Sequence, residues 1–297
     1  METLFKGVIP VVVTPFKKDG SFDFPAARKH LDWLAENGVQ SVCILGATGE
    51  YQSLNDEEHQ AYVAEIAPYA SERFVVYMGA SRERPDDVVK LMENGKKHGV
   101  AAAMVLPPFY YHAPQDEIVR NYRFINDRVD LPIMIYNNPG SCGYSIDFDT
   151  FGELFKLKNV RIIKESSGDI AVLTKLLGMA PEGVSLFCGT ENLAFESFAV
   201  GACGWISVAG NFAPKTCLEL HDLIVDKKDL AGAMKVYRKL LPALELLESF
   251  PKTAQTVKHI LAARRGIPAG YVRTPRHELS EEEKAYVLGA CDLDALR

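Results

Sequence analysis

The sequence predicts a (β/α)8 barrel, the TIM-barrel architecture, followed by a C-terminal helical bundle. Three observations carry this prediction: short apolar runs alternate with amphipathic segments, eight such runs occur, and they stop after residue 208. Parallel strands need a crossover of about a dozen residues, usually a helix, so the alternation indicates βαβ units. Nearly continuous apolar runs are typical of strands that are buried on both faces.

The eight apolar runs are the predicted strands, and they begin 20 to 33 residues apart. They cover residues 8–16, 41–46, 74–80, 101–107, 132–137, 160–165, 184–188 and 204–208. Eight strand–helix units within about 225 residues fit a barrel. A doubly wound open sheet is the alternative, but it usually carries a glycine-rich phosphate turn after its first strand. Here the first run ends in Thr14-Pro15-Phe16, without a GxGxxG motif.

The segments between the runs carry helix start and stop signals. Asp23 precedes a helical pattern with Pro25 in its first turn, and Asn55 precedes three acids, which suit the N-terminal end of a helix dipole. Gly38 and Gly99 are typical helix stops. Further helix starts are expected at Pro85, Pro114, Asp147 and Asp169.

Three helical segments follow the strands, at residues 230–250, 252–265 and 280–288. Pro242 lies inside the first segment and is expected to kink or split it, because proline has no backbone N–H. Ser280, with Glu283 three residues later, predicts a capping box. We therefore assign residues 1–225 to a catalytic barrel and residues 226–297 to a C-terminal helical domain.

The composition argues against several classes of protein. Hydrophobic residues make up 47% and charged residues 24% of the chain, as in an ordinary globular protein. A net charge of −6 without a basic block is not the footprint of a nucleic-acid binder. No stretch approaches the roughly 18 apolar residues that span a membrane, and the first residues do not resemble a secretory signal. We expect a cytoplasmic protein that binds neither nucleic acid nor membrane.

The cysteine and histidine spacings do not predict a metal site. The six cysteines form no CxxC pair, and the seven histidines form no HxH, HxxH or HExxH pair. Most of the histidines fall on predicted helices, so we expect them at the surface or at interfaces. We therefore expect no metal ion.

Lys164 is the most informative residue for chemistry. In a barrel the active site lies at the C-terminal ends of the strands, and Lys164 stands near the end of the sixth run, after Val160-Arg161-Ile162-Ile163. Burial disfavours a charged ammonium, and a neutral amine can attack a ketone to form a Schiff base. The alternative is a lysine that simply pairs with Glu165.

Tyr136 and a glycine-rich loop stand at other strand ends. Tyr136 belongs to the neighbouring fifth run, where a phenol can pass a proton to a reacting hydroxyl; the alternative is a core tyrosine with a solvated tip. After the second run, residues 46–49 read Gly-Ala-Thr-Gly. The backbone N–H groups of such a loop, with the Thr48 hydroxyl, can bind a carboxylate.

Together these motifs resemble the dihydrodipicolinate synthase / N-acetylneuraminate lyase family of class I aldolases. The resemblance runs from about residue 7 to the C-terminal helices, and no single motif carries it. The matching segments are residues 14–16, 46–50, 108–111, 136–139, 164–169, 201–208 and 270–275.

The resemblance implies a pyruvate or other 2-oxo acid held on Lys164 as a Schiff base, with no further cofactor. Tyr136 would be the proton shuttle, and Tyr110 a relay tyrosine that reaches across a tight dimer interface of a homotetramer, a dimer of dimers. The residues that would bind the substrate carboxylate or line its pocket are Gly46, Ala47, Thr48, Gly189 and Ile206. Those expected to contact hydroxyl groups of the substrate tail, by position only, are Ser166, Glu191 and Asn192.

The chain departs from the family pattern at two places. Ala47 stands where the family usually has a hydroxyl residue that links the two tyrosines. Residues 140–143 read Gly-Ser-Cys-Gly, without the arginine that binds the second substrate's carboxylate in true dihydrodipicolinate synthases.

Three functions follow from the resemblance. The first is aldol cleavage or dehydration of a 2-keto-3-deoxy sugar acid or a similar 2-oxo acid. The second is dihydrodipicolinate (4-hydroxy-tetrahydrodipicolinate) synthesis from pyruvate and aspartate semialdehyde, with a different carboxylate anchor. The third is a weakly catalytic sensor that binds a 2-oxo acid, which Ala47 favours and Lys164 with Tyr136 disfavours.

Overall fold

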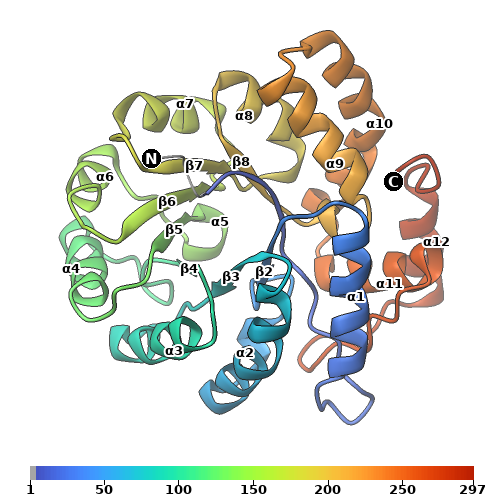
Figure 1. The fold of residues 1–297 in the computed structure, drawn as a ribbon, viewed down its shortest axis with the longest axis horizontal. Coiled ribbons are helices and arrows are strands. Elements are labelled where there is room, and N and C mark those ends of the chain that lie inside the picture. Colours follow the sequence, from blue (N-terminus) through green and yellow to red (C-terminus); the bar gives the residue numbers. More distant parts are fainter. Residues whose placement is uncertain (1–4) are drawn as a thin grey trace.

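The computed structural model describes residues 5–297, and its centre is a ring of eight parallel strands surrounded by helices (Figure 1). The strands are β1 (Gly7–Pro10), β2 (Ser41–Ile44), β3 (Val75–Gly79), β4 (Ala102–Val105), β5 (Ile133–Asn137), β6 (Val160–Glu165), β7 (Ser185–Cys188) and β8 (Gly204–Ser207). Each pairs with its neighbour in the order β1-β8-β7-β6-β5-β4-β3-β2. A parallel bridge between Val11 and Cys43 joins β1 to β2, so the predicted (β/α)8 barrel is confirmed.

The helices alternate with the strands and then continue beyond them. Those of the barrel are α1 (Phe24–Glu36), η1 (Tyr51–Ser53), α2 (Asp56–Ser71), α3 (Pro85–Lys97), α4 (Gln115–Asn126), α5 (Pro139–Cys142), α6 (Phe148–Leu154), α7 (Ile170–Met179), η2 (Glu191–Leu193), α8 (Ala194–Val200), η3 (Ala209–Asn211), α9 (Pro214–His221) and η4 (Asp222–Asp226). The C-terminal helices are α10 (Leu230–Ser249), α11 (Thr253–Arg265) and α12 (Glu281–Gly289), which confirms the predicted bundle.

Most helix starts lie where the sequence predicts them. The Asp23 side chain accepts a hydrogen bond from the Ala26 N–H at the start of α1. Reciprocal capping boxes join Asn55 to Glu58 at α2 and Ser280 to Glu283 at α12. These bonds satisfy backbone N–H groups that have no partner within the helix.

One prediction about local structure is wrong and another is wrong in part. The first strand ends at Pro10 rather than at residue 16: Val11 and Val12 still donate to Ser207 and Cys43, and the Thr14 hydroxyl then donates to the Gly49 carbonyl oxygen at 2.6 Å. Helix α10 continues through Pro242 to Ser249, so Pro242 does not split it. Packing of its apolar face, which includes Leu240, Ala243 and Leu244, offsets the missing hydrogen bond.

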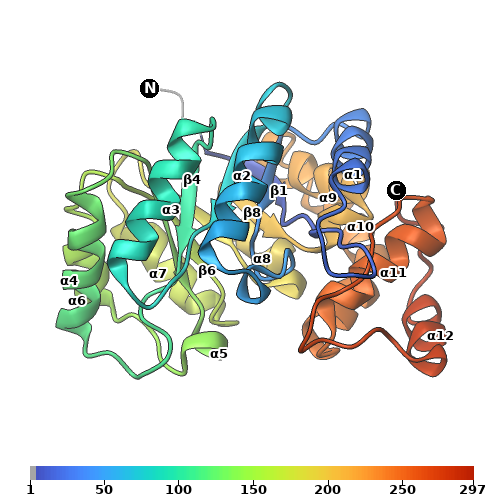
Figure 2. The ribbon, with the colours of Figure 1, turned by 90° about the horizontal axis from the view of Figure 1, so that it is seen from below.

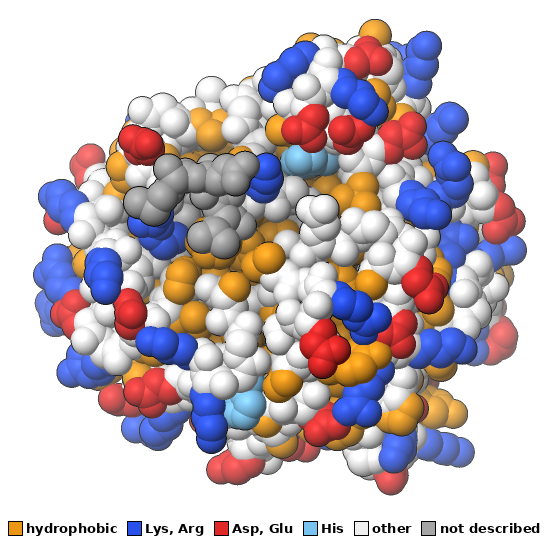
Figure 3. Space-filling model, in the orientation of Figure 1, with side chains coloured by type: hydrophobic (Ala, Val, Ile, Leu, Met, Phe, Trp, Pro, Cys, Tyr) orange, Lys and Arg blue, Asp and Glu red, His pale blue; other side chains and the backbone are white. Residues whose placement is uncertain are grey.

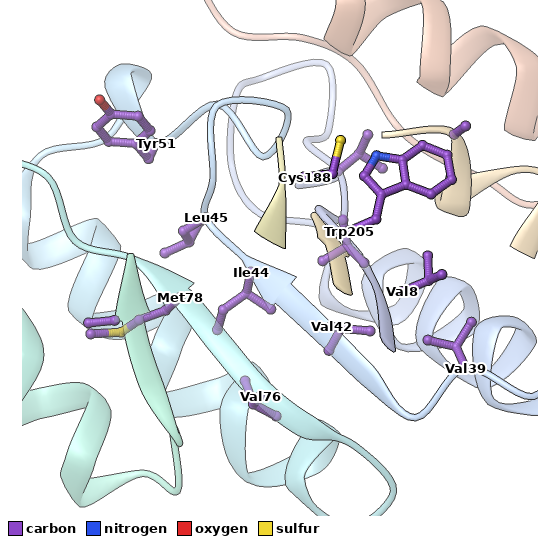
Figure 4. Close-up of a cluster of buried hydrophobic side chains, with 14 of the residues drawn as sticks. Val8, Val39, Val42, Ile44, Leu45, Tyr51, Val76, Met78, Cys188 and Trp205 are labelled. Atoms are coloured by element: carbon purple, nitrogen blue, oxygen red, sulfur yellow. The ribbon is translucent and has the colours of Figure 1, made fainter. Parts of the chain in front are cut away.

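The strands separate two apolar layers. Outward side chains of β2 and β3 (Val42, Ile44, Val76 and Met78) pack in the layer between strands and helices (Figure 4). The alternate residues, such as Cys43 and Tyr77, point into the barrel. Successive side chains of a strand point to opposite faces, so this alternation determines which residues at each strand end face the barrel interior.

The C-terminal helices pack along one side of the barrel (Figure 2). Helix α10 contacts α8, α9 and η2, and α11 brings Lys258 to the loop after β2. There the Lys258 ammonium lies 2.6 Å from the carboxylate of Glu50, and both side chains are buried. This ion pair ties the C-terminal segment to the same end of the barrel as the C-terminal ends of the strands.

On the face in Figure 3, basic and acidic side chains are interspersed rather than gathered by sign. In the part of the chain that the structure describes, no helix is both long enough and apolar enough to cross a bilayer.

Candidate active site

Lys164 and Tyr136 face the same end of the barrel interior. Tyr136 on β5 pairs in register with Lys164 on β6. Ile162 and Met134, two residues earlier on each strand, belong to the inner apolar cluster, so strand alternation turns Lys164 and Tyr136 inward as well. Lys164 is only 6% exposed, and its Nζ lies 3.9 Å from the centroid of the Tyr136 ring.

Lys164 is not paired with Glu165. The Glu165 carboxylate points to the other face of β6, where it accepts hydrogen bonds from Asn137 Nδ2 at 2.7 Å and from the Ser167 N–H at 2.5 Å. Within residues 5–297 Lys164 forms no ion pair. The amine is therefore available for chemistry rather than committed to a carboxylate.

A glycine directly after the next strand leaves room for the lysine side chain. A Cβ at Gly189, which follows β7, would lie 2.8 Å from both Cγ and Cε of Lys164 and 2.0 Å from Ser166 Oγ. Ser166 Oγ is buried and has no hydrogen-bond partner within the described residues. A buried hydroxyl without a partner is costly, so it is suited to bind a ligand.

The Tyr136 hydroxyl has one neighbour that directs its proton. Asn138 Nδ2 donates a hydrogen bond to Tyr136 Oη at 2.7 Å, while Asn138 Oδ1 accepts from the Ser141 N–H at the start of α5. Because the phenol oxygen accepts this bond, its own O–H is left to donate to a molecule in the site. Sequence reasoning assigned no role to Asn138.

A cavity of about 330 Å³ connects these groups. Of the predicted site residues, the structure brings together on its wall Ala47, Thr48, Tyr136, Lys164, Ser166, Gly189, Glu191 and Ile206. Gly46 lines a neighbouring cavity of about 260 Å³ instead, and Ala47 and Tyr136 lie between the two. Ala47 offers no hydroxyl at this junction.

Glu191 lies on the cavity wall, but its carboxylate is engaged by the protein. Its two oxygens accept hydrogen bonds from the Val208 N–H at 2.6 Å and the Ala209 N–H at 2.9 Å, and Ser207 Oγ lies 3.4 Å away. Burial raises the pKa of Glu191 to about 7, although the two backbone donors act to lower it. The carboxyl therefore holds the turn after β8 in place at the cavity wall, and it is not free to contact a ligand hydroxyl.

Two predicted site residues lie away from the cavity. Asn192 is not on its wall, and the Asn192 carbonyl oxygen accepts a hydrogen bond from the Tyr237 hydroxyl at 2.6 Å. Tyr110 is 90% exposed, and only its backbone N–H is fixed, by Glu83 Oε1 at 2.6 Å. Within this one chain neither side chain meets Lys164.

The C-terminal segment supplies cavity residues that the sequence analysis missed. These are Leu247, Glu248, Pro251, Thr253, Ala254, Gln255 and Arg276. They lie more than 80 residues along the chain from Lys164, and no local pattern marks them, so only the packing of α10 and α11 could show their place.

No potential metal site was found among residues 5–297, where no three His, Cys, Asp or Glu side chains gather closely enough to hold an ion. Two histidines that we expected at the surface or at interfaces are buried instead. His30 and His59 each bond a backbone carbonyl oxygen, of Asn211 and Gly79, and burial lowers the pKa of both to about 4. These rings are neutral core residues.

Comparison with known proteins identifies the family. The family model of the dihydrodipicolinate synthetase family matches residues 4–291. A Methanococcus vannielii protein named 4-hydroxy-tetrahydrodipicolinate synthase is 29% identical over 282 residues, which are 94% of this chain and 95% of that protein.

Solved structures agree over the same length. Dihydrodipicolinate synthase from Aquifex aeolicus has a TM-score of 0.89 and 28% identity, and the match covers 95% of this chain and 96% of that one. A prophage protein of the dihydrodipicolinic acid synthase family from E. coli K12, solved in complex with pyruvate, has a TM-score of 0.90 and 26% identity, covering 96% of each. With its barrel, its buried strand-end lysine and these matches, the chain belongs to the dihydrodipicolinate synthetase family and is a class I lyase of the kind that works through a lysine Schiff base.

Proposed function

We propose that the enzyme cleaves or dehydrates a 2-keto-3-deoxy sugar acid, or a closely related hydroxylated 2-oxo acid, through a Schiff base on Lys164. One observation carries the assignment of the lysine: the Lys164 amine lies 3.9 Å from the Tyr136 ring in a shared cavity, without a carboxylate partner among the described residues. An amine so placed can be the nucleophile, and the phenol beside it the acid–base group.

The first step joins substrate and enzyme. The neutral amine of Lys164 attacks the 2-oxo carbon, and the resulting carbinolamine loses water to give an iminium. Thr48 and the backbone N–H groups of its loop hold the adjacent carboxylate, and Ile206 packs against the carbon chain. Burial of both side chains supports this arrangement, because hydrogen bonds to a carboxylate are stronger away from water.

The iminium then accepts the electrons of a breaking bond. In aldol cleavage Tyr136 takes the proton of the 4-hydroxyl as it passes its own proton to a solvent water, the C3–C4 bond breaks, and its electron pair forms an enamine with the iminium. In dehydration a solvent water takes the proton from C3, and the 4-hydroxyl departs as water after it gains a proton from Tyr136. The bond from Asn138 to Tyr136 Oη suits both routes, because it orients the phenol without using its O–H.

Serine and cysteine side chains favour a hydroxylated tail. The buried, unpartnered hydroxyl of Ser166 can exchange hydrogen bonds with a substrate hydroxyl. Ser141 and Cys142, where an arginine would hold a second carboxylate, offer only neutral groups.

Dihydrodipicolinate synthesis is the second candidate. It is favoured by the names of relatives such as that from Methanococcus vannielii, which is similar along almost its whole length. In this reaction the enamine of pyruvate would attack the aldehyde of aspartate semialdehyde. A carboxylate anchor away from α5 would then be needed.

Tyr110 would act in the cavity of a second subunit. We propose that it enters the cavity of a neighbouring copy, which its exposure and the anchoring of its backbone by Glu83 support. A homotetramer built as a dimer of dimers would supply that copy. Sedimentation together with turnover of Tyr110→Phe tests this part: a fully active variant would remove Tyr110 from the reaction.

A turnover panel tests the proposed function. Hydroxylated 2-oxo acids of four to seven carbons, and pyruvate with a set of aldehydes, are incubated with the enzyme and the products are followed by mass spectrometry. We expect cleavage or loss of water from at least one hydroxylated acid. Turnover of pyruvate with aspartate semialdehyde alone would favour the second candidate, and an adduct without any turnover would favour the sensor.

A further inference from the structure

The substrate cavity extends beyond what a pyruvate moiety needs. A single buried water requires about 10–15 Å³, so a cavity of about 330 Å³ has room for about twenty water-sized groups, whereas pyruvate has only six non-hydrogen atoms. One end is built by the strand ends that carry Lys164, Tyr136 and Thr48. The rest is walled by the C-terminal segment, including Gln255 of α11 and Arg276 of the loop before α12. The tail of the substrate therefore meets residues that lie outside the barrel.

Arg276 presents unused hydrogen-bond donors to this end of the cavity. Its Nη1 donates to Ser53 Oγ at 2.9 Å, and its Nη2 lies 3.4 Å from Gln52 Oε1. Within residues 5–297 these are its only hydrogen-bond acceptors, and a guanidinium carries five N–H donors. These bonds to the short helix of residues 51–53 hold the planar guanidinium in place, and its remaining N–H donors are free to bind a ligand.

The positive charge of Arg276 is not balanced by the protein. The nearest carboxylate is that of Glu50, whose Oε2 lies 3.9 Å from Arg276 Nη1. Glu50 is already paired with Lys258 at 2.6 Å and also accepts the Arg273 N–H. Glu278 also acts on Lys258, but among residues 5–297 Glu50 is the one carboxylate that forms an ion pair with Arg276, and it is distant and shared.

Glu248 of α10 also lines the cavity, but it does not neutralise Arg276. Its carboxylate accepts a hydrogen bond from the backbone N–H of Glu191, after β7. No ion pair joins Glu248 to Arg276 among the described residues. An anionic group on the substrate would be repelled by Glu248 and attracted to Arg276.

We infer that the preferred substrate is a hydroxylated 2-oxo acid with a second carboxylate at its far end, and that Arg276 binds this carboxylate. The inference rests on the proposed function and narrows its substrate class to the diacids. A guanidinium binds a carboxylate through two parallel hydrogen bonds. One unbalanced positive charge matches a carboxylate better than a phosphate, which carries nearly two negative charges.

Schiff-base trapping measures this selectivity without turnover. The wild-type enzyme is titrated with 2-oxo acids of equal chain length that end in a carboxylate, a carboxamide, a hydroxymethyl group or a phosphate, and borohydride fixes the adduct. We expect half-saturation for the carboxylate at about a ten- to hundredfold lower concentration than for the carboxamide, as a charge-assisted hydrogen bond provides.

Variants of Arg276 test whether this residue causes the preference for a terminal carboxylate. Arg276→Gln should abolish the preference for the carboxylate, and Arg276→Lys should keep part of it. Arg264→Gln is the matched control: Arg264 lies on α11, 3.7 Å from Asp294, and does not line the cavity. Trapping of pyruvate should be unchanged in all three variants, which shows that the lysine end remains intact.

The outcomes separate this inference from the proposed function. Equal half-saturation for carboxylate and carboxamide, or a preference that survives in Arg276→Gln, would overturn the role of Arg276 and leave the lyase proposal standing. If the acid that ends in a phosphate binds more tightly, the preferred substrate is a phosphorylated 2-oxo acid and not a diacid. If no 2-oxo acid labels Lys164, the proposed function fails; calorimetry with the corresponding 2-hydroxy diacid, which cannot form an imine, still decides whether Arg276 binds the far carboxylate.

Discussion

Lys164 and Tyr136 occupy paired positions on adjacent strands, and the lysine amine lies 3.9 Å from the centre of the phenol ring. Both side chains rise from a rigid sheet rather than from loops, so their separation is set by strand pairing. The chemistry that we propose depends on this relationship.

Replacement of Tyr136 by phenylalanine should preserve the Schiff base and remove most turnover. Loss of a general acid–base group costs about 10²–10⁴-fold in rate. Tyr122→Phe is a suitable control, because the Tyr122 hydroxyl donates to the Val105 carbonyl oxygen outside the cavity. Steady-state rates of both variants check the prediction; a Tyr136→Phe enzyme within about threefold of wild type would make this tyrosine structural.

Gly189→Ala should inactivate the enzyme by displacing Lys164. The new methyl group would lie 2.8 Å from two lysine carbons and 2.0 Å from Ser166 Oγ, and overpacking of this kind costs about 1–3 kcal/mol. Gly178→Ala on α7, where an added Cβ meets nothing within 4 Å, should be neutral or slightly stabilising. Urea unfolding and borohydride trapping measure both effects. Normal trapping in Gly189→Ala would show that the lysine has more room than its contacts suggest.

Glu191 should make the stability of the protein depend on pH in a defined direction. Its folded-state pKa of about 7 lies above the ordinary value of 4.5, so the folded protein binds more protons than the unfolded chain between these values. Its contribution to the free energy of unfolding should therefore fall as pH rises from 4.5 to 7 and stay constant above, by an amount on the order of 3 kcal/mol.

Comparison of wild type with Glu191→Gln isolates this contribution. His30 and His59 act in the opposite direction, because burial lowers the pKa of both and stability then rises with pH. They are present in both proteins and cancel in the difference. Urea unfolding from pH 4.5 to 7.5 should give a difference curve with a slope below pH 7. A flat curve would mean that folding does not raise the pKa of Glu191.

Removal of divalent metals should leave activity unchanged. The iminium on Lys164 supplies the electron sink that a metal ion would otherwise provide. Dialysis against EDTA, followed by assay with and without added zinc or magnesium, checks this. Activity that is lost and then restored by a metal would contradict the Schiff-base mechanism.

Aspartate semialdehyde should be a poor substrate. The segment after β5, residues 140–143, lacks an arginine, and the loss of a charge-assisted bond costs about 1.5–3 kcal/mol, or about ten- to a hundredfold in affinity. Arg276 belongs to the loop before α12 and not to the segment after β5, so it would hold a carboxylate in a different place. A kcat/KM near about 10⁴ M⁻¹s⁻¹, the low end of the common range, with no turnover of sugar acids would favour dihydrodipicolinate synthesis.

The sequence predicts the fold and the barrel end of the site because both depend on short-range periodicity. The apolar runs define the strands, and alternation along β5 and β6 turns Tyr136 and Lys164 inward. The predicted length of β1 was wrong, because the apolar run continues past Val11 and Val12, whose N–H groups still bond to β8 and β2, to Thr14, whose hydroxyl bonds a loop instead.

Features set by long-range packing could not be predicted in this way. Arg276 reaches the cavity only because α10 and α11 fold back over the strand ends, and nothing in its local sequence marks it. His30 and His59 look like surface residues on helices, but each finds a buried backbone carbonyl oxygen on another segment. The hydrogen bonds of the Glu191 carboxylate likewise depend on the turn after β8, whose backbone N–H groups donate to it.

The location of the covalent adduct tests the central claim most directly. The enzyme is incubated with pyruvate and borohydride, digested, and mapped by mass spectrometry, with Lys164→Ala treated in parallel. We predict a single reduced pyruvyl adduct on Lys164 and none in the variant. An adduct on another lysine, or equal labelling of Lys164→Ala, would contradict the account.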